Sequence, residues 1–184
     1  MLLKKKISNN EFRIMHGIMR LADHIHPHVP GLAGSFGIEP GMTVVDYGCG
    51  PGRYAVEFSR LAGQDGKVIA VDLLEIALQE TEKRMKECGA DNIELKLAKG
   101  YDSGIPNETA DIVFAVDMFH HVDPVPFLEE ASRIAKPDGL LLISGGHQTR
   151  KSIKAAVAAS GLWELKEETR QFLKYGKRPE VLSC

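Results

Sequence analysis

Short apolar runs and segments of helical periodicity alternate along most of the chain. Two short apolar strands are predicted at Met42–Asp46, which ends in an acid, and at Val68–Val71. Two continuous apolar runs, Ile112–Val116 and Leu140–Ile143, are typical of parallel strands buried on both faces of a sheet. Between them, apolar residues recur every three to four positions, which is the spacing of amphipathic helices. Strands that alternate with helices predict right-handed crossovers and a doubly wound α/β fold, with a mostly parallel sheet of about seven strands.

The pattern changes at both ends of this alternation. Residues 162–175 contain two short β segments and predict an antiparallel C-terminal hairpin, while Ile93–Leu97 alternates apolar with polar residues like an edge strand. Ahead of the alternation, apolar residues recur at helical spacing over 8–26. We therefore expect a single domain in two parts: an N-terminal helical segment, residues 1–39, acting as a lid or substrate segment, and a core, residues 40–184.

Local signals place the ends of two helices. Asp123-Pro124 offers an N-cap residue followed by a proline at the first helical position. We expect this helix to end at the segment Lys136-Pro137-Asp138-Gly139, and a last helix to cover 150–159, ahead of Gly161.

Charge and cysteine content narrow the class of protein. The 184 residues include 23 Lys and Arg against 25 Asp and Glu, so no basic excess attracts nucleic acid or an anionic membrane. No apolar run approaches the roughly 18 residues that span a bilayer. Cys49, Cys88 and Cys184 are too few and too scattered for a disulfide framework or a zinc site. We expect a cytoplasmic protein that binds neither nucleic acid nor membrane.

The most informative stretch is a glycine-rich turn between the first core strand and the next helix. Gly48, Gly50 and Gly52 occupy every second position, so the backbone turns sharply and can approach a ligand closely. The dinucleotide-binding fingerprint requires a glycine where Arg53 stands, and no Gly-Lys-Ser/Thr follows as in a phosphate-binding loop. The spacing therefore argues against both of these nucleotide sites.

Two acids indicate what the turn binds instead. Asp46 ends the strand before the turn, where its negative charge opposes a phosphate and suits a cationic amine. Asp72 ends the next strand, where a carboxylate can accept hydrogen bonds from the two hydroxyls of a ribose. A ligand with a ribose, a cationic centre and no phosphate is an adenosyl amino acid.

These residues carry a resemblance to a known family. The motif Asp46-x-Gly48-x-Gly50-x-Gly52 with Asp72 resembles the class I S-adenosylmethionine-dependent methyltransferases, which have a Rossmann-like fold. Further matches across residues 40–145 are Ala110-Asp111-Ile112-Val113, Phe119-His120-His121-Val122, and Leu128 to Leu142 with Lys136-Pro137-Asp138-Gly139 inside. The cofactor implied by the resemblance is S-adenosyl-L-methionine.

The resemblance also implies roles for individual residues. The backbone around the turn would hold the methionine part, Asp46 would orient its amino group, and Asp72 would hold the ribose hydroxyls. Leu73, Gly100 and Tyr101 would contact the adenine, and Asp117 would face the sulfonium. The implied cofactor-binding set is Asp46, Tyr47, Gly48, Cys49, Gly50, Asp72, Leu73, Gly100, Tyr101 and Asp117.

One position departs from the family pattern. An acid often follows the third strand and accepts from the adenine amino group, but ungapped alignment places Lys99 there. A lysine cannot accept a hydrogen bond. Asp102 or a backbone carbonyl are the alternatives for this contact.

Histidines supply the candidate catalytic groups. His120 and His121 follow the fourth strand beside Asp117, where a histidine can act as a general base or position the acceptor. The alternative is that one histidine caps the loop by hydrogen bonding. His147 follows the fifth strand and could reach the same pocket. The loop with His24, His26 and His28 offers only Asp23 as a further ligand, so a polar hinge is favoured and no metal site is predicted.

The predicted function is methyl transfer from S-adenosylmethionine to a small-molecule acceptor by in-line displacement. A protein base is needed only where the acceptor must lose a proton. The Asn/Asp-Pro-Pro-aromatic motif of amino methylation is missing, because residues 117–120 read Asp-Met-Phe-His. Two alternatives stay open: a non-catalytic module or partner subunit that binds the cofactor or S-adenosylhomocysteine, and an oxidoreductase, which Arg53 disfavours. No residue pattern specifies the acceptor atom or the oligomeric state.

Overall fold

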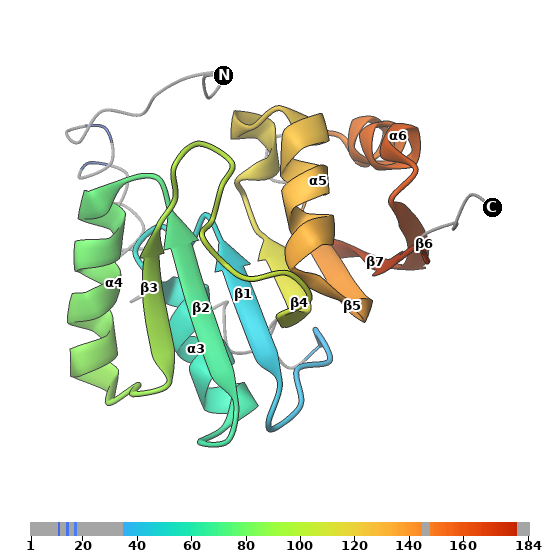
Figure 1. Cartoon of the computed structure of the whole chain (residues 1–184). Coiled ribbons are helices and arrows are strands. Elements are labelled where there is room, and N and C mark those ends of the chain that lie inside the picture. Colours follow the sequence, from blue (N-terminus) through green and yellow to red (C-terminus); the bar gives the residue numbers. More distant parts are fainter. Residues whose placement is uncertain (1–10, 12–13, 15–16, 18–34, 145–147, 180–184) are drawn as a thin grey trace.

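The fold is a twisted sheet with helices on both faces (Figure 1). The structure, a computed structural model, describes residues 11, 14, 17, 35–144 and 148–179. The sheet has seven strands in the order β3-β2-β1-β4-β5-β7-β6. Their bounds are β1 Thr43–Tyr47, β2 Lys67–Asp72, β3 Ile93–Leu97, β4 Ala110–Ala115, β5 Ala135–Ser144, β6 Trp163–Glu168 and β7 Phe172–Lys177.

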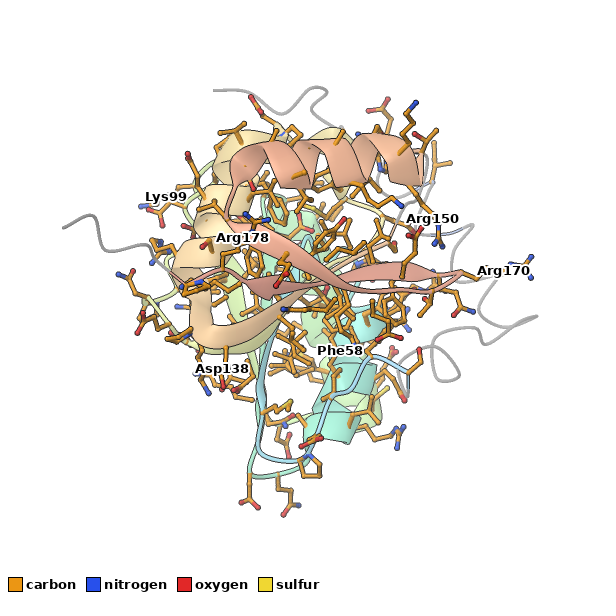
Figure 2. The ribbon with its side chains drawn as sticks, turned by 90° about the vertical axis from the view of Figure 1, so that its right-hand side faces the viewer. Phe58, Lys99, Asp138, Arg150, Arg170 and Arg178 are labelled. Atoms are coloured by element: carbon orange, nitrogen blue, oxygen red, sulfur yellow. The ribbon has the colours of Figure 1, made fainter. Side chains whose placement is uncertain are left out.

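Helices follow each of the strands β1, β2, β4 and β5, while a loop joins β3 to β4. The helices are α3 Arg53–Ala62, α4 Glu75–Cys88, the short 3-10 helix η1 Phe119–His121, α5 Pro124–Ile134 and α6 Arg150–Ser160. Strands β3, β2, β1, β4 and β5 pair in parallel, while β7 pairs antiparallel with β5 and with β6. The predicted doubly wound sheet of seven strands with a C-terminal hairpin is therefore confirmed. Figure 2 shows the hairpin beside α6, with Arg170 at its tip.

The central strands are buried on both faces, which explains why their sequences are continuously apolar. In β1, Val44 faces the cluster under α3 and α4, whereas Val45 faces the cluster under α5 and α6, and both are fully buried. Strand β3 lies at one edge of the sheet, as its alternating pattern predicts. At the opposite edge, five of the six residues of β6 are exposed and most are charged, which discourages pairing with another chain.

The helix that starts at Asp123-Pro124 ends earlier than expected. Asp123 caps it as predicted, since its side chain accepts from the backbone N–H of Val125, but the helix stops at Ile134. The segment expected to end it lies inside β5, where the pairing with β4 shifts register. The backbone turns back here so tightly that a Cβ on Gly139 would lie 2.9 Å from the carbonyl oxygen of Lys136. The segment therefore forms an irregularity at the start of a strand.

Little of the predicted N-terminal segment lies within the described residues. Glu11, Ile14 and Gly17 are helical, and the rest of the helix predicted over 8–26 lies outside them, as does the loop with His24, His26 and His28. Phe36 is described and lies in the core, with its ring 4.7 Å from that of Phe114 on β4. The boundary at residue 39 stays a prediction. Among the described helices, none is long and apolar enough to cross a membrane.

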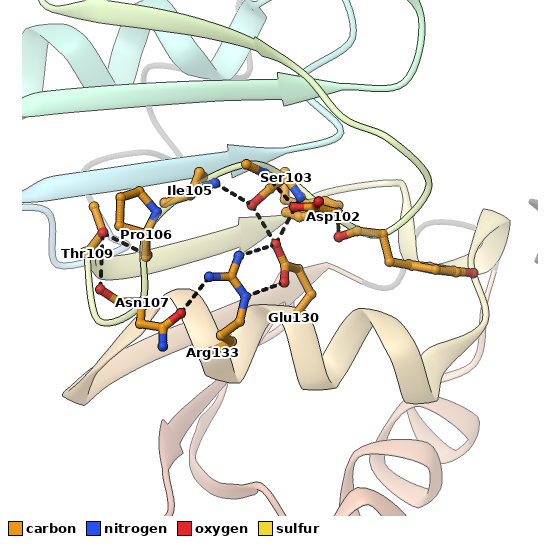
Figure 3. A network of polar contacts seen from close by, with 11 residues as sticks. Asp102, Ser103, Ile105, Pro106, Asn107, Thr109, Glu130 and Arg133 are labelled. Carbon is orange, nitrogen blue, oxygen red and sulfur yellow. Dashed lines mark hydrogen bonds and ion pairs between the residues drawn. The ribbon is translucent and has the colours of Figure 1, made fainter.

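A buried polar network fixes the loop between β3 and β4 onto α5 (Figure 3). One carboxylate oxygen of Glu130 accepts from the backbone N–H of Ser103 at 2.9 Å and from its hydroxyl at 2.6 Å. The other accepts from Nε of Arg133 at 2.7 Å, and Nη1 of Arg133 donates to Asn107. Burial raises the pKa of Glu130, but these hydrogen bonds outweigh burial and leave the pKa below its usual value.

We predict that Glu130→Ala lowers the free energy of unfolding by roughly 1.5–3 kcal/mol, because Ser103 and Arg133 lose a charged acceptor. Because the folded-state pKa is lowered, this contribution is present above about pH 4.3 and is lost as the pH falls further. Urea unfolding at about pH 7 and about pH 3 measures both effects. The exposed Glu129 is the matched control, and equal losses in Glu129→Ala and Glu130→Ala would contradict the prediction.

Candidate functional site

The candidate site lies beyond the carboxyl ends of the parallel strands, where the glycine turn follows β1. The backbone N–H groups of Gly48 and Cys49 both donate to the carbonyl of Val71, at 2.8 and 3.0 Å, so the turn closes over the end of β2. The turn ends at Gly52, which has a left-handed conformation and no side-chain cap, and α3 begins at Arg53. The polar backbone groups of the turn are therefore largely bonded within the protein, and the turn is fixed in shape.

The three glycines serve different purposes. A Cβ on Gly48 would lie 3.0 Å from the side chain of Met118, and a Cβ on Gly52 would lie 2.6 Å from Thr81. These two glycines let the β4 loop and α4 approach the turn closely. Gly50 has open space on its Cα and a φ of +52°, so it is the glycine whose exposed backbone a ligand can approach.

The backbone N–H and carbonyl of Gly50 are each hydrogen-bonded to a side chain from another element. Asp72, at the end of β2, accepts from its N–H at 2.9 Å, and the hydroxyl of Thr81 on α4 donates to its carbonyl at 2.9 Å. The next carbonyl, of Pro51, accepts from Nε of Arg84 at 3.0 Å. The other oxygen of Asp72 accepts from the backbone N–H of Leu74 at 2.9 Å. Each oxygen of Asp72 keeps a lone pair for further donors such as ribose hydroxyls.

Asp46 is a buried acid beside the turn. It is 2% exposed, and its Oδ2 has no hydrogen-bond partner among the described residues. Burial and then the nearby charge of Asp72 raise the pKa of Asp46 to about 7, although the backbone N–H of Ala55 favours the carboxylate. Burial likewise raises the pKa of the Cys49 thiol in the turn, so this thiol is neutral and is a small apolar side chain.

Asp117 follows β4 at the same edge of the sheet. Its φ of +53° places an exposed, non-glycine residue in the left-handed region, a strained conformation that is common at functional sites. Its backbone N–H donates to Oγ of Ser144, at the end of β5, at 3.2 Å. The rings of His120 and His121 in η1, shortly after Asp117, have centroids 3.8 Å apart and are tilted by 43° to one another.

The residues predicted to contact adenine lie in the loop after β3, away from the glycine turn. Lys99 and Asp102 bridge a tight turn in which Gly100 is exposed at a φ of +67°. The hydroxyl of Tyr101 accepts from the backbone N–H of Asp123 at 2.7 Å, so this residue joins the loop to α5. Asp102 accepts from the backbone N–H of Gly104 at 2.9 Å, so one of its oxygens already binds within the loop. Its role toward adenine stays a prediction.

The structure thus gathers six of the predicted residues at the glycine turn. Asp46, Gly48, Cys49, Gly50 and Asp72 surround the turn, and Asp117 follows β4 next to Met118, which lies against Gly48. Tyr47, Leu73 and Tyr101 pack together against the cluster under α5. The hydroxyl of Tyr47 donates to the carbonyl of Tyr101 at 2.8 Å, so its side chain supports the adenine loop from below. His147 lies outside the described residues.

Sequence reasoning missed two polar side chains that hold the site together. Thr81 is fully buried on the apolar face of α4, and a hydroxyl on such a face is a signal that it has a partner. Ser144 directly follows the apolar run of β5, at the edge where doubly wound folds bind their ligands. Among the described residues, no cluster of three or more His, Cys, Asp or Glu side chains could hold a metal ion.

Comparison with known proteins identifies the family. Residues 45–143, more than half of the chain, match the family model described as a methyltransferase domain. The ubiquinone/menaquinone biosynthesis C-methyltransferase of Escherichia coli is 31% identical over 109 residues, which cover 58% of this chain and 43% of that protein. The matching region therefore spans less than half of this relative's length.

Two solved structures share the fold. A protein of Methanococcus maripaludis proposed to be an S-adenosyl-L-methionine-dependent methyltransferase has a TM-score of 0.79 at 19% identity, covering 97% of this chain and 98% of that one. The geranyl diphosphate C-methyltransferase of Streptomyces coelicolor has a TM-score of 0.69 at 15% identity, covering 83% and 76%. That structure contains S-adenosyl-L-homocysteine. The chain belongs to the methyltransferase domain family, whose class I members use S-adenosylmethionine as the cofactor.

The residues present fit this cofactor. Oδ2 of Asp46 is a buried acceptor without a partner among the described residues, which suits an ammonium group or a water bound to it. Gly50 leaves open space at the turn, and Asp72 keeps acceptor capacity for ribose hydroxyls. All three lie at the carboxyl edge of the sheet, where doubly wound folds bind their ligands.

We predict that Thr81→Val weakens binding of S-adenosylhomocysteine about tenfold, or ~1.4 kcal/mol, because the carbonyl of Gly50 loses its donor. Thr81→Ser is the matched control, since it keeps the hydroxyl and loses only the methyl group. Calorimetric titration measures the affinities, and urea unfolding checks that both variants fold. Equal affinities of the two variants would show that the hydroxyl does not position the turn.

A second prediction concerns pH. S-adenosylhomocysteine retains the cationic amino group of the cofactor, so its binding requires Asp46 as a carboxylate. With a pKa of about 7, Asp46 is mostly protonated at lower pH in the free protein. The affinity should therefore fall about tenfold between about pH 8 and about pH 6. Without ligand, the free energy of unfolding should decrease as the pH rises from about 4 to about 7, because the folded state holds a proton that the unfolded state has released.

Asp46→Asn tests both effects, because the amide does not titrate. Its affinity should be weaker than that of the wild type and should not change across this range. Its stability should also lose the decrease between about pH 4 and about pH 7. A wild-type-like pH profile in Asp46→Asn would assign the titration to another group.

Proposed function

We propose that the protein transfers a methyl group from S-adenosylmethionine to a small-molecule acceptor. The observation that carries the proposal is the buried Oδ2 of Asp46, which has no hydrogen-bond partner among the described residues, at the turn where Gly50 leaves open space. A buried acceptor oxygen without a partner is costly, and a cationic ligand would satisfy it, which supports a cation at this turn. Asp72 adds a ribose-binding carboxylate on the other side of the turn.

The cofactor supplies the chemistry in the form of a sulfonium-bound methyl group, which an acceptor atom attacks in line as the carbon–sulfur bond breaks. The task of the chain is to bind both partners in line and to exclude water. Asp46 and Asp72 bind and orient the donor, and the rigid Gly50 peptide fixes its position. Asp117 borders the reacting end, beside Ser144.

Two adjacent histidines are the proposed acceptor-side groups. His120 and His121 follow Asp117 in η1 at the carboxyl edge of β4. An imidazole there can accept a proton from an acceptor that must lose one, and it can orient one that need not. We propose His121, His120 and Asp117 as the residues next to the acceptor. The backbone N–H of His121 donates to the carbonyl of Met118 at 2.8 Å, which closes the short helix, and the side chain of Met118 lies against Gly48 of the turn.

A small-molecule acceptor is supported by the relatives and by the charge of the chain. The Escherichia coli relative is named for ubiquinone and menaquinone biosynthesis, and the Streptomyces coelicolor structure for geranyl diphosphate. The net charge of −2 offers no attraction for nucleic acid. A cytoplasmic location is supported by Cys49 and Cys88, whose thiols are free.

Calorimetric titration with S-adenosylmethionine, S-adenosylhomocysteine and NAD tests the donor site. We predict micromolar binding of the two adenosyl ligands, no binding of NAD, and about 100-fold weaker binding in Asp72→Ala, because ribose and Gly50 lose a charged acceptor. Asp65→Ala, which removes an exposed acid before β2, should bind as the wild type does.

Two outcomes would change the assignment. Absence of heat with both adenosyl ligands in a folded sample would overturn the proposed donor site. Binding of both, with no S-adenosylhomocysteine produced from any of a panel of small-molecule acceptors, would favour the alternative of a non-catalytic binding module or partner subunit.

A further inference from the structure

A cavity of about 40 Å³ lies on the α3 face of the sheet, at the carboxyl ends of β4 and β5. Its walls are largely aromatic: Phe36, Tyr54 at the start of α3, Phe114 on β4 and Phe172 on β7. The ring of Phe36 lies 4.7 Å from that of Phe114 and 5.3 Å from that of Phe172. Segments far apart in the sequence therefore build one apolar chamber, and Phe36 contacts most of its walls.

This cavity borders the site described above. In the β1–β4 ladder, Phe114 is the partner of Asp46, and the hydrogen bond from Ala55 of α3 places the carboxylate of Asp46 on the same face of the sheet. At its other end, the cavity is lined by Val116 and Ser144. Oγ of Ser144 accepts from the backbone N–H of Asp117, so the wall of the cavity and the proposed reacting edge share a hydrogen bond.

The lining defines what the cavity can accept. Within the described part of the chain, none of its lining residues is charged, and its polar side chains are those of Tyr54, Ser144 and Gln171. A charged group placed there would lose its hydration and would meet no opposite charge among these lining residues, which is unfavourable. An engineered apolar cavity of ~150 Å³ holds benzene. A cavity of about 40 Å³ therefore holds only the end of a ligand, of the order of two carbon atoms.

We propose that this cavity receives an uncharged apolar end of the methyl acceptor. This inference rests on the proposed function, and it assigns the acceptor to molecules that carry a short, uncharged aliphatic end. The charged groups of an acceptor would have to lie outside the cavity. The chamber then acts as a specificity pocket that sets the depth at which the acceptor lies beside Asp117.

The rim of the cavity is fixed by the turn between β6 and β7. Oγ1 of Thr169 accepts from the backbone N–H groups of Gln171 and Phe172, at 3.2 Å each. Gln171 is exposed at this rim, so its side chain can be enlarged without disturbing the core. Arg170, its neighbour, points away from the molecule at the hairpin tip (Figure 2). These two positions provide a matched pair for testing the cavity.

The test uses the full chain saturated with S-adenosylhomocysteine. Two probes of the same shape are compared by saturation-transfer NMR: 3-methylbutan-1-ol, which is neutral, and 3-methylbutan-1-amine, which is a cation at neutral pH. We expect saturable, millimolar binding of the alcohol, which is reasonable for so small a ligand, and at least tenfold weaker binding of the amine. Equal binding of both probes, or binding of neither, would overturn the inference.

Three variants locate the binding. Gln171→Trp covers the rim and Val116→Phe fills the cavity from β4, and each should weaken binding of the alcohol at least tenfold. Arg170→Trp adds the same indole next to the rim but outside the cavity, and it should change binding less than twofold. Wild-type binding of the alcohol in Gln171→Trp and Val116→Phe would place the probe elsewhere and overturn the inference.

The cofactor titration separates the two possible failures. If the wild-type protein does not bind S-adenosylhomocysteine, the proposed function fails and the inference fails with it. If S-adenosylhomocysteine binds but the probes show no selectivity, only the specificity pocket is wrong. Gln171→Trp, whose substitution lies on the hairpin, should bind S-adenosylhomocysteine within about threefold of the wild type, which shows that loss of the alcohol is not a loss of the donor site.

Discussion

The geometry of the site depends on two hydrogen bonds to the backbone of Gly50. Its N–H is bound by Asp72 from the end of β2, and its carbonyl is bound by Thr81 from α4. Neither side chain belongs to the turn itself, so the turn is held by elements that fold around it. Preorganisation of this kind removes the entropic cost of ordering a loop when a ligand binds. The open face of Gly50 is therefore both accessible and rigid.

The carboxylates of Asp46 and Asp72 repel one another, and a bound cation would reduce this repulsion. Asp46 lies in the core without a counterion among the described residues, and the charge of Asp72 raises its pKa further. Burial also raises the pKa of Asp72, although hydrogen bonds from the backbone N–H groups of Leu74, Gly50 and Leu73 favour its carboxylate. Bringing a cation next to Asp46 removes both the burial penalty and part of the repulsion between the acids. The strain at Asp117, on the next strand of the sheet, lies at the same edge.

Much of this arrangement could be predicted from the sequence, because periodicity and glycine spacing are local properties. Periodicity predicts the strands, the edge position of β3 and the C-terminal hairpin. Glycine spacing and the acids at the strand ends predict the cluster of Asp46, Gly50 and Asp72. Contacts between elements that are distant in the sequence could not be predicted in this way. Thr81 reads as one more position on a helix face, and Tyr47 lies next to the turn in sequence although its side chain faces α5. The segment Lys136–Gly139 reads as a helix end because Pro and Gly stop helices, yet here they shape the irregular start of β5.

The position of Trp163 gives the protein an internal optical reporter. It is the one tryptophan of the chain, it is 1% exposed, and its Nε1 donates to the carbonyl of Leu128 on α5 at 3.3 Å. Three strands, β4, β5 and β7, separate β6 from the glycine turn of β1. Its fluorescence therefore follows the docking of the hairpin onto α5 and is insensitive to ligand exchange at the turn. Unfolding of the C-terminal part of the sheet and occupancy of the site can thus be followed separately in the same unlabelled protein.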